Sequence, residues 1–285
     1  MYRLTMKHII LTAAAIMLTL VACSDDDNTS EGQQVVVEGW IEDGEFPIVK
    51  LSSTIPITDK YQSLDSLGRY ILRWQRVTIS DGSQTVTLSG KIDERYFPPY
   101  IYTTTDMRGQ TGRTYRLTIH RTDMPDITAE TTIPESVPID SFSTEIFDGN
   151  PTRRSIYAHT TISPYPVTYY KMFTRQKDDS QDYLSSFLGV MRSDMIPADG
   201  RISIQPGRTN FEKNYIPYYN VGDTVFVRFA RIDSVSYEYW RSFEDMLSLS
   251  RNSLFPITKN MPSTIPDALG YWQGFGSKYY RVIVE

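Results

Sequence analysis

Alternation of apolar and polar side chains is the feature that most constrains the fold of this chain. The stretch RVTISDGSQTVTLSG carries apolar residues at alternate positions on both sides of an Asp81-Gly82 pair, and these are Val77, Ile79, Val86 and Leu88. Successive side chains of a β-strand point to opposite faces, so the pattern places all four on one buried face. An Asp-Gly pair between two such runs is typical of a hairpin turn. The stretch is therefore predicted to form two paired strands.

Further stretches of the first half show strand patterns of the same kind. They are VVVEGWIEDG with the following IVKL, then GQTGRTYRLTIH, and finally ITAETTIP. The chain also contains 20 tyrosines, and aromatic residues favour strands over helices. Residues 35–135 are therefore predicted to form a β-sandwich domain, either immunoglobulin-like or transthyretin-like.

The segment PESVPID separates this region from the second half of the chain. Its prolines, Pro134 and Pro138, predict a stiff boundary. Strand-like runs continue beyond it, and the clearest is DTVFVRFARID, in which Val225, Val227 and Phe229 fall on one face. Residues 138–285 are predicted to form a second β-rich domain, so the expected fold is mainly all-β with two sandwich-like domains.

One segment of the second domain departs from the strand pattern. In SVSYEYWRSFEDMLSLSRNS, apolar side chains recur every three or four residues, and these are Tyr237, Trp240, Phe243, Met246 and Leu247. The spacing predicts an amphipathic helix near residues 236–251. Ser234 or Ser236 is expected to be its N-cap. The apolar stripe is interpreted as a face that packs on a sheet, with a binding groove as the alternative.

The first residues have the pattern of a secretory signal peptide. Residues 1–22 combine a basic start with an apolar stretch from Ile9 to Leu20 and small residues before Cys23. The apolar stretch is shorter than the roughly 20 residues of a membrane-spanning helix. The sequence LVAC at 20–23 resembles a bacterial lipobox. Cys23 is therefore predicted to carry lipid chains, palmitate among them, that hold the protein in a membrane.

A short acidic segment follows the cysteine. Residues 23–34 are polar and lack periodicity, which predicts a lipidated flexible tether. Its residues Ser24, Asp25, Asp26 and Asp27 resemble the export signal of surface lipoproteins in the Bacteroidota, and an ordinary solvated tether is the alternative. The protein is therefore expected to be lipid-anchored in the outer membrane and exposed at the cell surface, with a position facing the periplasm left open.

Charge and motif content argue against several classes of function. The formal net charge is −5, and an acidic chain is a poor partner for nucleic acid. The three histidines are not at metal-ligand spacing, so no metal is expected. The sequence contains no nucleophile elbow, S-x-x-K motif or P-loop, so no catalytic residue and no cofactor are predicted. Motifs do not test for a triad assembled from distant residues.

Three aromatic-rich stretches are candidate binding surfaces. The C-terminal GYWQGFGSKYYRVIVE carries Tyr271, Trp272 and Phe275, interpreted either as part of a buried final strand or as an exposed surface that stacks on a sugar ring or grips a partner. The loops YFPPYIYTTT at 96–105 and FEKNYIPYYN at 211–220 are alternatives, because proline restricts their flexibility. The expected ligand is a glycan or a peptide.

Five short stretches carry a family resemblance. They are LVACSDDD, VVVEGWIEDG, VTISDG, GRTYRLTI and ITAETTIP. Together they resemble a family of Bacteroidota lipoproteins known as domain of unknown function 4249, with the clearest likeness from Val35 to Pro134. Members are often encoded near TonB-dependent receptors, so the resemblance implies an accessory role in nutrient capture at the outer membrane. It implies no catalytic residues, and only Cys23 and residues 24–27 correspond to positions with a role.

Three classes of function are compatible with these observations. A non-catalytic binding or accessory lipoprotein that serves a TonB-dependent receptor is favoured, because the anchor, the strands and the lack of catalytic motifs agree. A structural or adhesive subunit, similar to a fimbrial one, would need a missing or displaceable strand. An uncharacterised hydrolase would need a cleft with converging catalytic groups.

Overall fold

The computed structural model describes residues 33–55, 68–122, 124–176, 182–207, 215–249 and 261–285. Strands dominate these residues, and Gln34–Glu285 form one compact unit. The prediction of a mainly β fold with an amphipathic helix in the C-terminal half is confirmed. The predicted signal peptide, Cys23 and the tether up to residue 32 lie outside the described residues.

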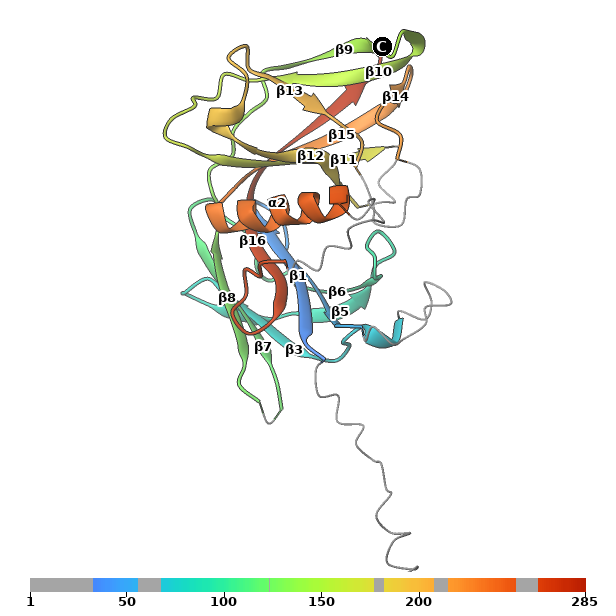
Figure 1. Ribbon diagram of the computed structural model, residues 1–285. Helices are drawn as coiled ribbons and strands as arrows, with labels where there is room; N and C mark the ends of the chain where they lie inside the picture. The colour runs from blue at the N-terminus through green and yellow to red at the C-terminus, as the bar shows by residue number, and fades with distance from the viewer. Residues whose placement is uncertain (1–32, 56–67, 123, 177–181, 208–214, 250–260) are drawn as a thin grey trace, which may run out of the picture. The chain divides into compact units, whose positions relative to one another are not determined.

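An eight-stranded sheet forms the centre of the fold (Figure 1). Its strand order is β12-β11-β15-β16-β1-β2-β6-β5. The strands are β1 (Val35–Glu42), β2 (Ile48–Ser53), β5 (Ser89–Ile92), β6 (Tyr100–Thr103), β11 (Tyr169–Gln176), β12 (Leu184–Arg192), β15 (Thr224–Ile232) and β16 (Leu269–Ile283). The pair β1 and β16 is parallel, and the other neighbours are antiparallel.

Two four-stranded sheets accompany the central one. The first has the order β4-β3-β7-β8 and consists of β3 (Arg76–Ser80), β4 (Thr85–Thr87), β7 (Thr114–His120) and β8 (Ile127–Thr132). In the second, β10 pairs with three strands, and its members are β9 (Ser141–Phe147), β10 (Asn150–His159), β13 (Arg201–Ile204) and β14 (Tyr219–Asn220).

Two apolar cores lie between the central sheet and the smaller sheets. The first core joins β1 and β2 to the sheet β4-β3-β7-β8, and the second joins β11 and β15 to β10 and β13. Val77, Ile79 and Leu88 are all buried in the first core, so their predicted common face is confirmed. Val225, Val227 and Phe229 are likewise buried together in the second core. Each smaller sheet therefore forms a sandwich with its own part of the central sheet.

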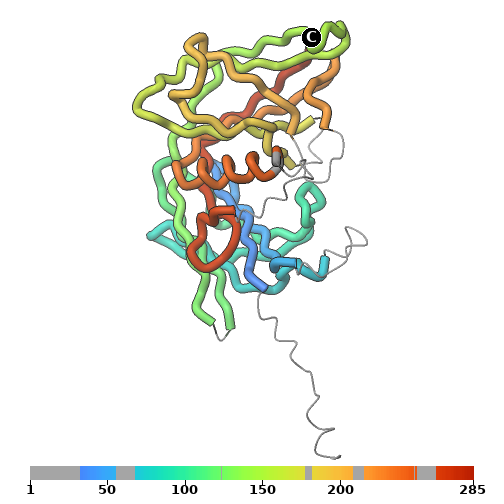
Figure 2. Tube along the Cα trace, in the orientation of Figure 1, coloured from blue at the N-terminus to red at the C-terminus, as the bar shows by residue number. Residues whose placement is uncertain are grey.

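The last strand contributes to both cores. Trp272 is 2% exposed and packs in the first core, whereas Val282 packs in the second. β16 pairs with β1 along Leu269 to Phe275 and with β15 along Gly276 to Ile283, and Figures 1 and 2 show its red ribbon beside both strands. The division into domains 35–135 and 138–285 stays a prediction, and the structure adds a connection between them that the prediction did not include.

The end of β8 and the residues that follow it cross this strand at two glycines. A Cβ on Gly274 would lie 2.6 Å from the carbonyl oxygen of Thr132, and one on Gly276 would clash with the carbonyl oxygen of Pro134. Only glycine allows the two backbones to approach so closely. Just beyond the crossing, the amide of Ile139 donates a hydrogen bond of 2.6 Å to the hydroxyl of Tyr280.

The helix α2 (Ser234–Leu249) packs on the face of the central sheet opposite the two cores (Figure 1), and we call this face the helical face. Tyr237, Trp240 and Phe243 pack there with aromatic residues of β16, as the interpretation of the stripe expects. Asp233 caps the helix, because its Oδ1 accepts a 2.7 Å hydrogen bond from the amide of Ser236. The expected serine caps are therefore wrong by one to three residues. The side chain of Leu247 lies outside the described residues.

Two ion pairs are buried on the helical face. Arg228 donates a 2.8 Å hydrogen bond to Glu42, whose second oxygen accepts a 2.5 Å hydrogen bond from Tyr279. Lys171 donates a 2.8 Å hydrogen bond to Glu244 of α2. Burial lowers the pKa of Lys171, and the neighbouring carboxylate offsets this effect only in part.

Candidate functional site

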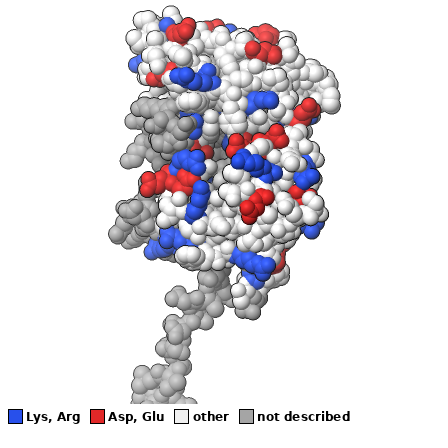
Figure 3. All heavy atoms as spheres, turned by 180° about the vertical axis from the view of Figure 1, so that it is seen from behind, with Lys and Arg blue, Asp and Glu red and all other residues white. Residues whose placement is uncertain are grey.

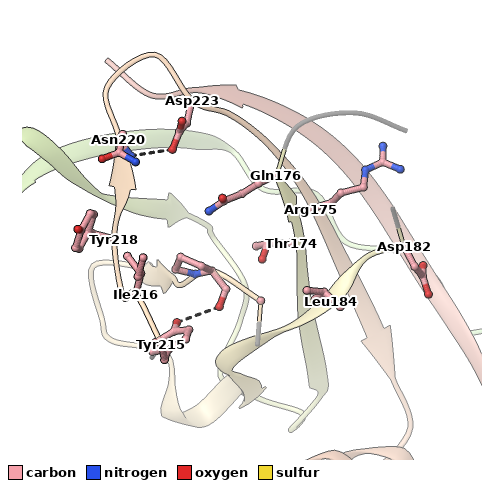
Figure 4. A pocket seen from close by; sticks show the side chains of 12 residues that line it. Thr174, Arg175, Gln176, Asp182, Leu184, Tyr215, Ile216, Tyr218, Asn220 and Asp223 are labelled. Atoms are coloured by element: carbon pink, nitrogen blue, oxygen red, sulfur yellow. Dashed lines mark hydrogen bonds between the residues drawn. The ribbon is translucent and has the colours of Figure 1, made fainter. Parts of the chain in front are cut away.

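A pocket of about 320 Å³ opens at the edge of the second core, between the end of β11 and the connection from β13 to β14 (Figure 4). This volume lies at the lower end of the range of small-ligand pockets. Side chains from several strands and turns line it, and those used below are Thr174, Gln176, Leu184, Tyr215, Tyr218, Asn220 and Asp223.

Two polar side chains of β11 face the pocket because side chains alternate along a strand. Tyr170 and Met172 are buried in the second core. Thr174 and Gln176 continue the same face beyond the edge of that core, where they line the pocket. Figure 4 shows Thr174 in the middle of the site and Gln176 above it. The strand therefore changes from a core element to a binding element without a change in conformation.

Two tyrosines on the opposite side are held in place by their neighbours. The hydroxyl of Tyr215 donates a 3.0 Å hydrogen bond to the carbonyl of Pro206, drawn as a dashed line in Figure 4. The ring of Tyr218 contacts the ring of Phe147, at 5.3 Å between centroids, and the guanidinium of Arg153, at 4.5 Å. Both rings thus present fixed aromatic surface, which loses little entropy when a ligand binds.

The turn between β14 and β15 supplies the remaining polar groups. Asp223 Oδ2 accepts a 2.8 Å hydrogen bond from the amide of Asn220. Gly222 has a φ of 89°, a conformation that favours glycine, and its amide donates to the carbonyl of Val284 at 2.7 Å. The turn is thereby attached to the C-terminal residues, and it holds the side chain of Asn220 at the pocket.

A buried hydroxyl of the pocket lacks a partner among the described residues. Thr174 is 1% exposed, and its neighbour Tyr219 is fully buried. Neither hydroxyl forms a hydrogen bond of normal geometry within the described part of the chain. Burial also raises the pKa of Tyr219, so this phenol stays protonated at physiological pH. The side chain of Thr174 adjoins this phenol and partly offsets the effect of burial on the pKa of Tyr219.

Two charged residues, Arg175 and Asp182, line one side of the pocket. The guanidinium of Arg175 lies over the rings of Tyr183, at 4.6 Å, and Phe226, at 4.8 Å. Burial raises the pKa of Asp182, against the opposing effect of Arg228. Figure 4 shows Arg175 and Asp182 on the side of the site away from Tyr218. The rest of the pocket is lined by the hydroxyl of Thr174, the carboxamides of Gln176 and Asn220, and aromatic rings. The carboxylate of Asp223 accepts the hydrogen bond from the amide of Asn220.

The structure corrects the exposed alternative for the C-terminal aromatic residues. Tyr271, Trp272 and Phe275 are 7%, 2% and 1% exposed. Trp272 Nε1 donates a 3.0 Å hydrogen bond to the carbonyl of Tyr115 inside the first core. Tyr271 and Phe275 belong to the aromatic cluster under α2. The alternation of β16 buries side chains on both faces of the central sheet, so these three residues stabilise the fold and offer no binding surface.

The two proline-containing loops have different positions. In the loop at 96–105, Tyr100 and Tyr102 are buried, while Tyr96 contacts the ring of Trp40 at 5.9 Å. Burial, reinforced by Asp182, raises the pKa of Tyr96 to about 12. In the loop at 211–220, residues 211–214 lie outside the described residues, and Tyr215 and Tyr218 line the pocket. The structure therefore brings only the second loop to the pocket.

The two described histidines, His120 and His159, form hydrogen bonds with nearby side chains. His120 Nδ1 lies 2.8 Å from Asp126 Oδ2, and its Nε2 lies 3.3 Å from the hydroxyl of Thr78. This order resembles a catalytic triad, but β3 is paired on both sides at Thr78, so its backbone amide is not free to stabilise an oxyanion. His159 Nε2 lies 2.8 Å from the hydroxyl of Ser143. Within the described ranges, no three His, Cys, Asp or Glu side chains are grouped as metal ligands.

Sequence reasoning missed most of the pocket. Thr174, Gln176 and Leu184 belong to strands whose pattern shows only that they are strands. Asp223 and Asn220 have turn chemistry that occurs at many surface turns. The aromatic stretch at 211–220 was the available signal, and it marks one wall of the site.

The surface and the helices of the described residues add two observations. On the side shown in Figure 3, basic and acidic side chains are interspersed, without the continuous basic stripe that binds nucleic acid. No helix in the described part of the chain is long and apolar enough to cross a bilayer.

Comparison with known proteins identifies the family of the chain. A family model described as Domain of unknown function (DUF4249) matches residues 24–280. No curated protein matches the chain. The match covers all of the described strands except the last residues of β16, and it includes the pocket.

Proposed function

Because the chain belongs to the DUF4249 family, whose description names no activity, we propose its function from the pocket and the sequence. The proposed function is that of a non-catalytic binding lipoprotein at the outer membrane, exposed at the cell surface, which captures a small glycan for a TonB-dependent receptor. The fold presents the binding site, and the lipid on Cys23 keeps it at the membrane.

The pocket carries this proposal. A sugar offers hydroxyl groups that both donate and accept hydrogen bonds, and it offers apolar ring faces. The carboxamides of Gln176 and Asn220 also donate and accept, and the hydroxyl of Thr174 does the same. The fixed rings of Tyr215 and Tyr218 match the apolar faces. Arg175 and Asp182 have opposite charges and lie on the side of the pocket away from Tyr218, so a strongly charged ligand fits the rest of the pocket less well.

The sequence supports the location. The lipobox at 20–23 and the acidic residues 24–27 predict an anchored, exported protein. The resemblance described above connects such proteins with TonB-dependent receptors, which import ligands too large or too scarce for passive entry. A receptor that takes up a sugar would gain from a neighbouring subunit that binds the same sugar.

Ligand titration tests the proposal. The probes are neutral disaccharides such as maltose and cellobiose, compared with glucuronic acid and a dipeptide, and heat of binding is measured by calorimetry. We expect binding of a neutral saccharide that weakens about tenfold in Gln176→Ala, because one hydrogen bond to the ligand is lost. Tyr218→Ala should weaken it by a similar factor.

Matched controls separate the pocket from general effects. Gln84→Ala removes an exposed glutamine in the turn before β4 and should leave binding unchanged. Saccharide binding that both pocket variants retain would contradict the assignment of the site, and binding of the dipeptide alone would exclude a glycan ligand.

A second experiment tests location and partner. The tagged lipoprotein is purified from native outer membranes, and intact cells are treated with protease in parallel. Recovery of a TonB-dependent receptor together with protease cleavage would support the proposal. Full protection without a recovered receptor would contradict it.

A further inference from the structure

Trp74 is the most exposed large apolar residue of the described chain. It is 89% exposed and lies in the segment before β3. Its φ of 65° is in the left-handed region, which a bulky side chain rarely adopts. Such a conformation persists only where the surrounding structure enforces it, and it often marks a functional position.

A buried tyrosine enforces this conformation. Tyr102 of β6 is 1% exposed. Its hydroxyl donates a 2.7 Å hydrogen bond to the carbonyl of Leu72 and accepts a 2.9 Å hydrogen bond from the amide of Gln75. These two bonds close the turn from both sides and direct the indole of Trp74 into solvent. The exposure of this tryptophan is therefore built into the fold.

The same end of the molecule receives the chain from Cys23. Gln34 is fixed to the end of β2, because its amide donates to Thr54 Oγ1 at 2.9 Å and its carbonyl accepts from the amide of Thr54 at 2.8 Å. Ile71 forms a bridge with Ser52 of β2. The segment that carries Trp74 thus lies beside the point where the fold begins.

Further apolar and basic side chains share this end. Arg76, at the start of β3, pairs with His120, at the end of β7, so the turn after β7 lies at the same end as Trp74. Met124 in that turn is 59% exposed. Arg73 and Arg76 are exposed as well. Figure 1 shows the β7–β8 turn and the start of β1 together at the bottom of the view.

We propose that this end of the molecule, defined by Trp74, Met124, Arg73 and Arg76, rests on the surface of a lipid bilayer with the indole of Trp74 among the headgroups. The proposal depends on the lipid anchor of the proposed function. Tryptophan prefers the boundary between headgroups and acyl chains, since one edge of its ring is apolar and its N–H is polar. Arginines next to it attract anionic headgroups.

The length of the tether makes this contact accessible. Gln34 is eleven positions after Cys23 in the sequence. A fully extended chain of that length spans about 40 Å at most, so the bilayer that holds Cys23 cannot be farther away than this from Gln34. A bilayer is therefore the surface that this end meets most often, and contact with it orients the pocket away from the membrane.

Fluorescence quenching tests the contact. The full-length lipidated protein is reconstituted into vesicles of phosphatidylethanolamine and phosphatidylglycerol with brominated acyl chains, which quench only nearby indoles. The difference between the wild type and Trp74→Phe isolates the emission of Trp74. We expect a blue shift and at least twofold quenching of this emission. Addition of salt should reduce both if the arginines contribute.

A matched reporter at the other end provides the control. Ile146 of β9 is 56% exposed and lies near the C-terminal residue, which Figure 1 places opposite the start of β1. In the double variant Trp74→Phe with Ile146→Trp, the new indole should remain unquenched. Equal quenching at both positions would overturn the proposed orientation.

The outcomes distinguish this proposal from the anchor itself. Mass spectrometry of Cys23 and flotation of the vesicles test the anchor. A protein without lipid gives a negative result in both measurements. A lipidated protein whose Trp74 emission keeps its value in water would overturn the contact. An emission shift that appears only after outer-membrane proteins are added would assign this end to a protein partner instead. Trp74→Gly should lose the signal without a lower Tm, because glycine adopts the left-handed conformation freely.

Discussion

The two faces of the central sheet use the same strands in different ways. Toward the smaller sheets, the strands bury mostly aliphatic side chains in two cores. On the helical face, they bury aromatic rings, two ion pairs and several polar atoms without partners among the described residues. Ile41 and Glu42 show the contrast, because they are adjacent on β1 and both are buried, one on each face.

The two faces of the sheet contribute in different ways to the stability of the fold and to its specificity. Close-packed aliphatic side chains stabilise a fold in proportion to the apolar area they bury. A buried ion pair gains little against its own desolvation, but it penalises any arrangement that breaks it. The cores of this protein therefore supply stability, whereas the pair Arg228–Glu42 joins β15 to β1 across β16.

The largest effect is expected from breaking that pair. Glu42→Ala removes the carboxylate that is hydrogen-bonded to buried Arg228 and also removes the acceptor of Tyr279. We expect the free energy of unfolding to fall by about 3–5 kcal/mol, as measured by urea denaturation. The double variant Glu42→Leu with Arg228→Met should lose much less, because no charge is left unpaired. Equal losses in both would show that packing, and not charge, governs this site.

A smaller effect is expected on the other face of the same strand. Ile41→Val deletes one methylene from the first core, where Ile41 is fully buried. The expected loss is about 1 kcal/mol, measured in the same denaturation experiment. A loss as large as that of Glu42→Ala would remove the distinction between the two faces.

A pH-dependent effect is expected at a partly exposed ion pair. The hydrogen bond from Arg95 lowers the pKa of Asp93 from 3.8 to about 2, against the opposing effect of burial. The carboxyl of Asp93 therefore binds a proton less tightly in the folded state than in the unfolded state. Its ionised form stabilises the folded state fully above pH 3.8, and this stabilisation is lost as the pH falls toward 2. Because Arg95 is 52% exposed, the stabilisation should not exceed about 1 kcal/mol.

The measurement compares acid unfolding of the wild type with that of Asp93→Asn. The two curves should differ at pH 5 and converge near pH 2. Curves that stay parallel over this range would show that Asp93 titrates alike in the folded and unfolded states.

The smallest effect is expected at an exposed pair. Arg116 and Glu130 face each other across β7 and β8, and their side chains are 62% and 53% exposed. Glu130→Ala should change the free energy of unfolding by about 0.5 kcal/mol or less. A larger change, abolished by 1 M salt, would show that this outer face is less solvated than its exposure indicates.

Local patterns predicted the elements well. The alternation around Asp81-Gly82 identified two strands, and Asp81 closes the turn with hydrogen bonds to the amides of Ser83 and Gln84. The helical spacing identified the start of α2 to within two residues, and the helix continues to Leu249, the last described residue of this segment. The error in its cap arose because Asp233 completes the preceding strand pattern and was counted with it.

Long-range pairing was not predictable from the same patterns. Alternation shows that β16 is a strand, but it does not show that β1 is its parallel neighbour. The apolar run of β16 is buried on both faces, so Tyr271 and Trp272 give the same signal as an exposed aromatic patch. The pocket also depends on long-range contacts, because its residues come from β11, β12, β14 and the segments next to these strands.

The parallel pairing of β1 with β16 also determines when this protein can fold. Val37 at the start of the fold faces Gly270 near its end, a contact of very high sequence separation. Trp272, one of the largest fully buried side chains, is missing from the first core until the chain has almost finished emerging. A chain without β16 lacks the parallel neighbour of β1 and the tryptophan of the first core. We therefore expect the first core to close late in folding, after β16 has joined β1.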